Sequence, residues 1–106
     1  MTDFPSAGQR PRAARFALGT LAATPGALQL LERLGVSPLA LIGRHVTGDF
    51  GELEAEDQAA NEQAIASGFR VFSAYTLSAA ADAPERLWVI TEADRSVTTL
   101  LLPSEY

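Results

Sequence analysis

The most constraining feature of this sequence is a change in the spacing of its apolar residues at Gly68. Before that glycine, apolar residues recur at the period of an α-helix that is buried on one side. After it, short runs rich in β-branched and aromatic residues predict strands: "FRVFSAYTL", "RLWVIT" and "SVTTLLL". Helices followed by strands bury both patterns when the helices pack on a sheet, so the sequence predicts an α+β domain.

The clearest local signal predicts a helix over residues 25–34. Thr24 can cap it, Pro25 suits its first turn, and Gly35 can end it. A second short helix is predicted to begin at Pro38 after a Ser37 cap and to end near "HVTGDFG". The expected apolar positions of these two helices are Leu28, Leu31, Leu34, Leu39, Ile42 and Val46.

A third helix is predicted between Leu53 and Gly68, with a face of small apolar residues: Ala59, Ala60, Ala64 and Ile65. The strands after it are joined by "SAAADAPE" and "EADR", which favours an antiparallel meander. "RFALGTLAA" is either a further short strand or an extended lead-in. We therefore expect about three N-terminal helices packed on a C-terminal antiparallel sheet of three to four strands, with Trp88 and Ile90 in the core.

The chain has 106 residues, which is the length of one ordinary domain. We expect that domain to span residues 15–106, after a flexible tail over residues 1–14. Cysteine is absent, which excludes disulfides and thiolate metal sites. No apolar stretch has the length of a signal peptide or membrane span, so a cytoplasmic protein without a membrane partner is expected.

Charge is unevenly distributed along the chain. The net charge is −5, but Arg10, Arg12 and Arg15 cluster near the N-terminus. Residues 49–62 carry six acids and no base. This acidic run is either the solvated start of a helix or a patch that binds a partner.

The only histidine, His45, lies in "RHVTGDFGE", close to Asp49, Phe50 and Glu52. A histidine near carboxylates can act as a general acid or base, and the glycines around Asp49 can aim a side chain toward a cleft. The alternative is an ordinary histidine at a helix C-terminus followed by a turn. His45, Asp49 and Glu52 lack the spacing of a specific metal site, so neither a metal nor a cofactor is expected.

The predicted hairpin "WVITEADRSVTT" is unusually polar. Its hydroxyls are compatible with ordinary strand pairing, and Asp94 and Arg95 with a turn that carries a surface ion pair. Alternatively, arginines and hydroxyls on one sheet face could hold a phosphate. The candidates for that role are Arg70, Tyr75, Thr91, Arg95, Ser96, Thr98 and Thr99.

Four blocks carry a family resemblance: "ATPGALQLLERLG", "RHVTGDFGELEAED", "GFRVFSAYTL" and "LWVITEADRSVTTLLLPSEY". They resemble, in this order, the small plasmid-related proteins of proteobacterial mobile elements, which are sometimes labelled type I restriction endonuclease subunit M. The resemblance runs from Ala23 to Tyr106 and departs at Phe50, where members usually carry tryptophan. The label does not fit, because 106 residues cannot hold a doubly wound cofactor-binding sheet.

The order of elements is also similar to that of small metal-independent ribonuclease toxins of the barnase type. That similarity implies His45 as general base or acid and Arg70 and Arg95 as phosphate ligands. Tyr75, Thr98 or Thr99 would then position the phosphate. The acidic net charge opposes avid RNA binding.

Two functions follow from these patterns. The first is an accessory protein of mobile elements that binds a protein of the bacterial host and inhibits a defence system; its candidate binding residues are Asp49, Phe50, Glu52, Asp94, Ser96 and Thr99. The second is a ribonuclease-like enzyme that uses His45, Arg70, Tyr75, Arg95 and Thr98. The enzyme requires His45 and at least two of its proposed partners to meet in one cleft.

Overall fold

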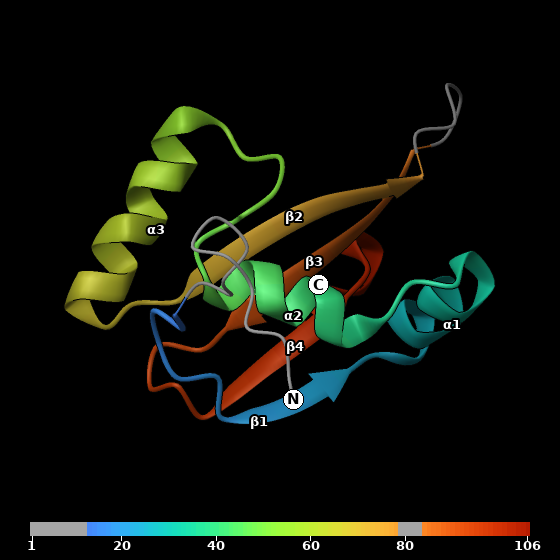
Figure 1. Cartoon of the computed structure of the whole chain (residues 1–106), viewed down its shortest axis with the longest axis horizontal. Helices are drawn as coiled ribbons and strands as arrows, with labels where there is room; N and C mark the ends of the chain where they lie inside the picture. Colours follow the sequence, from blue (N-terminus) through green and yellow to red (C-terminus); the bar gives the residue numbers. More distant parts are fainter. Residues whose placement is uncertain (1–12, 79–83) are drawn as a thin grey trace, which may run out of the picture.

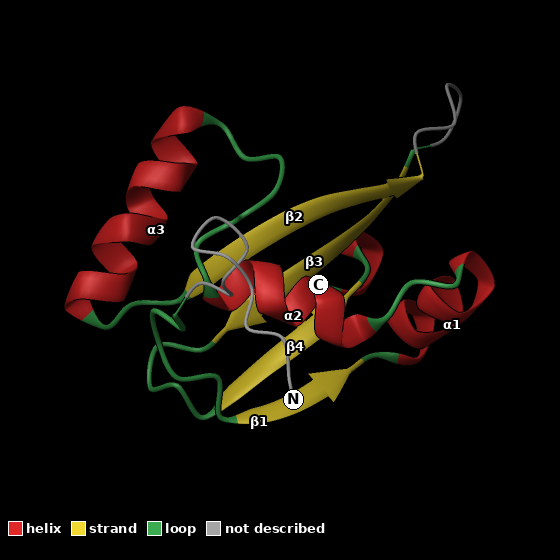
Figure 2. Ribbon diagram, viewed as in Figure 1, coloured by secondary structure: helices red, strands yellow, loops and turns green. Residues whose placement is uncertain are grey.

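A computed structural model describes residues 13–78 and 84–106 (Figures 1 and 2). Along these residues the elements are β1 (Thr20–Ala23), α1 (Pro25–Leu34), α2 (Pro38–Val46), α3 (Ala55–Ser67), β2 (Val71–Ser78), β3 (Glu85–Thr91), β4 (Val97–Leu101) and the 3₁₀ turn η2 (Pro103–Glu105). The α+β class with N-terminal helices is therefore confirmed. Most of the expected tail, residues 1–12, and the centre of the loop "SAAADAPE" lie outside the described residues.

The described strands form a single sheet in the order β1-β4-β3-β2. β2 pairs with β3 and β3 with β4 in antiparallel fashion, which is the meander expected from the sequence. β1 extends that sheet by pairing with β4 in parallel, with Leu21 opposite Thr98. The sheet is therefore mixed, because the chain crosses from β1 through all the described α-helices before it reaches the meander.

Helices α1 and α2 cover one face of the sheet (Figure 1). Their buried side chains meet those of alternate strand residues in one cluster: Ala27, Leu30, Leu31, Leu41, Ile42, Tyr75, Leu87, Val89 and Leu100. Helix α3 lies apart from this cluster, beside β2, where Ala64 packs with Phe50 and Val71. On the opposite face η2 lies against β3. Helices thus cover one face of the sheet, and the other is the more open.

The helix termini follow the sequence signals closely. The Thr24 hydroxyl accepts a hydrogen bond from the backbone N–H of Ala27, and Gly35 ends α1 with a φ of 67°. The bounds of α1 equal those predicted. The Glu105 carboxylate accepts hydrogen bonds from the Thr24 hydroxyl and from the Gly26 N–H, so η2 is attached to the start of α1.

We expect Thr24→Ala to lower the free energy of unfolding by about 1 kcal/mol, the usual cost of losing an N-cap side chain. The matched control is Ser37→Ala, because Ser37 occupies the N-cap of α2 but its side chain makes no capping hydrogen bond. Its cost should stay below about 0.5 kcal/mol. Urea denaturation of both variants measures the difference, and equal losses would contradict this role of Thr24.

The predicted apolar positions of the helices need correction. Leu28 and Leu39 are 51% and 67% exposed, whereas their neighbours Leu30 and Leu41 are buried. In α3, Asn61 and Ala64 are buried, while Ala59 and Ala60 are exposed. Leucines in α1 and α2 and alanines in α3 recur so often that periodicity alone selects more than one face.

The outer edge of β2 is covered. Asn61 in α3 pairs its side-chain amide with both backbone groups of Phe72, at 2.6 and 3.0 Å. Next to it, Ala74 donates to the Phe50 carbonyl and accepts from the Glu52 N–H. These contacts satisfy backbone groups that an edge strand would otherwise expose, and they hold residues 50–52 against the sheet.

Trp88 and Ile90 were predicted to lie in the core; Ile90 is a buried core residue, but both side chains point away from α1 and α2 and Trp88 is only half-buried. The buried residues of β3 beneath those helices are the alternate ones, Leu87, Val89 and Thr91. Ile90 is 5% exposed and Trp88 is half-buried on the other face.

Among the described residues, no helix has the length and apolarity needed to cross a bilayer.

Candidate functional site

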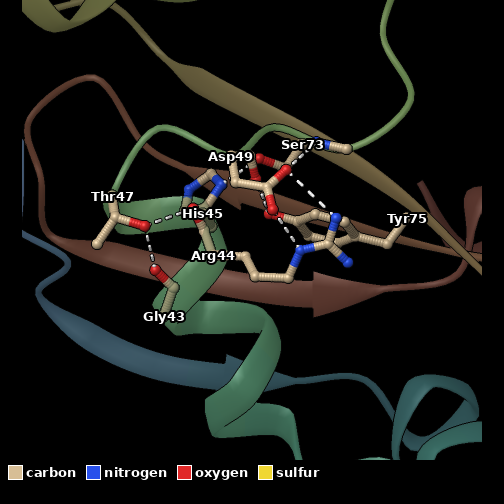
Figure 3. A network of polar contacts seen from close by, with 8 residues as sticks. Gly43, Arg44, His45, Thr47, Asp49, Ser73 and Tyr75 are labelled. Atoms are coloured by element: carbon tan, nitrogen blue, oxygen red, sulfur yellow. Dashed lines mark hydrogen bonds and ion pairs between the residues drawn. The ribbon is translucent and has the colours of Figure 1, made fainter. Parts of the chain in front are cut away.

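His45 lies in the last turn of α2, against β2 and the end of β3 (Figure 3). Its ring is fully buried, and both nitrogens are engaged: Nδ1 lies 2.6 Å from the Ser73 hydroxyl and Nε2 lies 2.9 Å from the Thr91 hydroxyl. Phe16 packs edge-on against the ring, with centroids 5.2 Å apart. The imidazole is therefore a core group joined to β2 and β3.

The direction of the hydrogen bonds fixes the tautomer of His45. Thr98 donates its hydroxyl proton to the Leu18 carbonyl at 2.8 Å. The 2.7 Å contact between Thr91 and Thr98 must then use the Thr91 proton. Thr91 in turn must accept from Nε2–H, which leaves Nδ1 as the acceptor for Ser73. A neutral His45 ring therefore satisfies every hydrogen bond in the series that runs from Ser73 through His45, Thr91 and Thr98 to the Leu18 carbonyl.

Burial lowers the pKa of His45 to about 4, because the cation would lose its hydration without gaining a charged partner. Burial likewise raises the pKa of Tyr75 to about 12. The Tyr75 hydroxyl donates to the Asp49 carbonyl at 2.6 Å. Both groups are uncharged near neutral pH, as a packed interior requires.

Of the residues proposed for catalysis, the structure brings Tyr75 and Thr98 close to His45 but not into a cleft. Ser73, Thr91 and Thr98 are fully buried, and Tyr75 is 1% exposed. A general base must come within hydrogen-bond reach of a substrate proton, and this ring has no exposed atom or free nitrogen in this conformation. The geometry is that of a polar core network.

Arg95 is directed away from His45 and toward the end of α3. Its guanidinium donates to the carbonyls of Ala64 and Phe69 at 3.0 and 2.6 Å, and it lies 5.6 Å from the centre of the Phe16 ring. A cation at a helix C-terminus is favourable because it opposes the helix dipole. Arg95 also has a φ of 60°, which lets the turn between β3 and β4 close. Its role is structural.

The other polar residues of the hairpin are divided between the turn and the two faces of the sheet. Asp94 accepts from the Ser96 N–H in a turn at 3.0 Å, and the Ser96 side chain, together with this backbone contact, lowers the pKa of Asp94. Thr99 lies opposite Ile90 on the face away from α2. Asp94, Ser96 and Thr99 therefore do not join His45 in one site.

Arg70 lies at the start of β2 and is also remote from the imidazole network. It donates to the Tyr106 hydroxyl at 2.8 Å and to Glu92 at 3.1 Å. Glu92 raises the pKa of Arg70 and neutralises its charge. A phosphate bound at Arg70 would have to compete with this carboxylate.

The segment after α2 places its three candidate residues differently. Asp49 forms a two-pronged ion pair with Arg44, whose guanidinium lies 4.4 Å from the centre of the Tyr75 ring (Figure 3). Phe50 is buried, 3% exposed, so it is a core residue rather than a contact for a partner. Glu52 is exposed beside the edge of β2. Only Glu52 of these residues combines exposure with a side chain free of hydrogen bonds among the described residues.

The principal surface feature was not identified from the sequence. On the sheet face opposite α1 and α2, Phe72 and Trp88 pack edge-on with centroids 5.0 Å apart, and Tyr106 follows at 5.6 Å from Trp88. We call Phe72, Trp88, Ile90 and Tyr106 the aromatic face. Strand alternation separates Phe72 and Trp88 from Tyr75 and Leu87. A single layer of helices can cover only one of those two sets.

Among residues 13–78 and 84–106, no group of three or more His, Cys, Asp or Glu side chains is arranged to hold a metal ion. No family model, curated protein or solved structure matches the chain. Its function must therefore be argued from its own geometry.

Proposed function

We propose that this protein is a non-catalytic interaction module that binds another protein through the aromatic face. The observation that carries this proposal is the contrast between the two sides of the sheet. The polar network around His45 is closed and fully hydrogen-bonded, whereas the aromatic face has the half-buried rings of Phe72 and Trp88 and the exposed ring of Tyr106 beside hollows in the surface. Aromatic residues are enriched where proteins bind one another.

The surroundings of the aromatic face favour a protein over a nucleic acid. Exposed aromatic rings can also stack on bases, but that mode requires a positively charged path for the phosphates. Here Arg70 is paired with Glu92, and Glu52 and Glu54 line the surface next to Trp88. The net charge of −5 adds a general repulsion of polyanions.

The resemblance to plasmid-related proteins supports a partner that belongs to the bacterial host. An accessory protein of a mobile element would meet the defence systems of its bacterial host. A small acidic module could inhibit such a complex by occupying a surface that the complex needs. We include this inhibition in the proposal, and it rests on the sequence blocks between Ala23 and Tyr106.

We expect Trp88→Ala to reduce recovery of a host partner at least about tenfold, since central aromatic residues dominate binding energy. The measurement is affinity capture from a bacterial lysate with tagged protein, followed by binding assays with the purified partner. Leu28→Ala is the matched control, because Leu28 is exposed on α1, away from the aromatic face. Cooperative urea denaturation of Trp88→Ala, compared with that of the unaltered protein, separates lost binding from lost folding.

Two results would overturn the proposal. One is a partner whose affinity survives Trp88→Ala in a variant that is still folded. The other is cleavage of RNA without added metal that copurifies with the folded protein. This activity would have to disappear in a His45 variant that is still folded.

A further inference from the structure

Two hollows lie on either side of the contact between Phe72 and Trp88. The first has a volume of about 420 Å³ and is lined by Glu52, Leu53, Glu54, Phe72, Ala74, Thr76, Arg86 and Trp88. The second has a volume of about 300 Å³ and is lined by Arg70, Phe72, Trp88, Ile90 and Tyr106. We call them the acidic hollow and the apolar hollow. Because they share two aromatic rings, one ligand can occupy both.

The acidic hollow combines carboxylates with aromatic surface. Glu52 and Glu54 are exposed on its rim, opposite Arg86, so two negative charges face one positive charge. Neither glutamate has an ion pair within the described residues, although the charge of Glu52 also acts on Arg44. A cationic side chain there would approach both carboxylates and the face of an aromatic ring, a combination that favours cations.

The backbone next to the acidic hollow is held in place. Glu52 donates its N–H to the Ala74 carbonyl at 2.7 Å, and Ala74 donates to the Phe50 carbonyl at 3.1 Å. Gly51, which lies between Phe50 and Glu52 in the sequence, has a φ of 74°. A Cβ at this position would lie 2.1 Å from the Ala74 carbonyl oxygen. This close approach requires glycine, and it positions Glu52 before any ligand arrives.

The apolar hollow differs in its charge. Its one cation, Arg70, is already neutralised by Glu92 and hydrogen-bonded to the Tyr106 hydroxyl. The remaining lining consists of the rings of Phe72, Trp88 and Tyr106 and the side chain of Ile90. Such a hollow suits an uncharged, bulky apolar side chain, whose burial removes apolar surface from water on both sides.

We infer that the aromatic face recognises an extended segment of the partner that carries an arginine or lysine together with a bulky apolar residue. The cation occupies the acidic hollow and the apolar side chain occupies the apolar hollow. This inference rests on the proposed function and specifies the chemistry of the partner.

The test uses short blocked peptides and the only tryptophan of the chain, Trp88, whose indole N–H gives a single NMR signal. A peptide of alternating leucine and arginine should shift that signal and the amide signals of Glu52 and Glu54. A peptide with citrulline for arginine should bind about fivefold more weakly at low salt, as expected for two exposed carboxylate contacts. A peptide with serine for leucine should also bind more weakly.

Matched variants assign the effect to the hollow. Glu52→Gln with Glu54→Gln should abolish the preference for arginine over citrulline. Glu56→Gln with Asp57→Asn removes the same charge from the same acidic run, outside the lining, and should preserve it. Equal binding of the arginine and citrulline peptides would overturn the inference, as would tighter binding of single-stranded oligouridine to the same face. If the peptides fail while Trp88→Ala still abolishes partner capture, the proposed function stands and only this partner chemistry is wrong.

Discussion

Replacing His45 by alanine should lower the free energy of unfolding by about 4 kcal/mol. The change leaves the buried hydroxyls of Ser73 and Thr91 without their shared partner and opens a cavity beside Phe16. An unsatisfied buried polar group costs about 1 to 3 kcal/mol, and truncation of a large core side chain adds a cavity term. Because a domain of this size has about 5 to 15 kcal/mol in total, much of the variant should be unfolded at moderate urea concentrations.

A combined apolar replacement provides the control. His45→Leu with Ser73→Ala and Thr91→Val removes the polar groups together, so no hydroxyl of that set remains unpaired. Since exchanging both partners for apolar groups is close to neutral, this variant should recover more than half of the loss. Trp88 fluorescence during urea denaturation measures each value. A loss below about 1 kcal/mol for His45→Ala would show that the ring is not part of the core.

The bounds of the first helix and the faces of the strands were predictable because local chemistry determines them. Thr24, Pro25 and Gly35 act within one turn of the helix they delimit. Simple alternation along each strand puts Ser73 on one face with Tyr75 in β2 and Leu87 on one face with Thr91 in β3, and all four are buried. The weak alternation around Thr20 gave no indication of its parallel partner, since β1 and β4 are separated by most of the chain.

The role of His45 was not predictable, because it depends on tertiary contacts between distant residues. Ser73 and Thr91 are 28 and 46 positions away, and their hydroxyls resembled ordinary strand residues. Arg95 was equally ambiguous, since its charge suggested phosphate binding, but its guanidinium binds the Ala64 carbonyl in the last turn of α3. In each case the residue type indicated which groups the side chain can bind, but tertiary packing determined which groups it contacts.

The polar hairpin that first suggested an active site therefore has a structural explanation. Thr91 and Thr98 continue the hydrogen-bond chain of His45, and Asp94 and Arg95 build the turn. Trp88 is the exception, since it faces the hollows instead of the helix-covered core. In this hairpin the proposed function therefore depends on Trp88 and not on the hydroxyl side chains.

The second large effect is a dependence of stability on pH. His45 has a pKa of about 4 in the folded protein and an ordinary value of 6.5 when exposed, so the unfolded chain binds its proton first. The stability linked to this ring is fully present above pH 6.5 and is lost as the pH falls toward 4. A shift of this size corresponds to about 3 kcal/mol, since each pKa unit is worth about 1.4 kcal/mol.

Urea denaturation at successive pH values should show this loss, and the apolar variant of His45, Ser73 and Thr91 should lack it in the same window. The lowered pKa values of Glu62 and Glu85 add a further loss at lower pH, but that loss is common to both proteins and cancels in the difference. Because His45 is the only histidine, its ring signals can be followed alone by NMR in the folded protein. They should remain those of a neutral Nε2–H ring down to about pH 5, and a titration midpoint near 6.5 would mean that the ring reaches solvent and that the closed network is wrong.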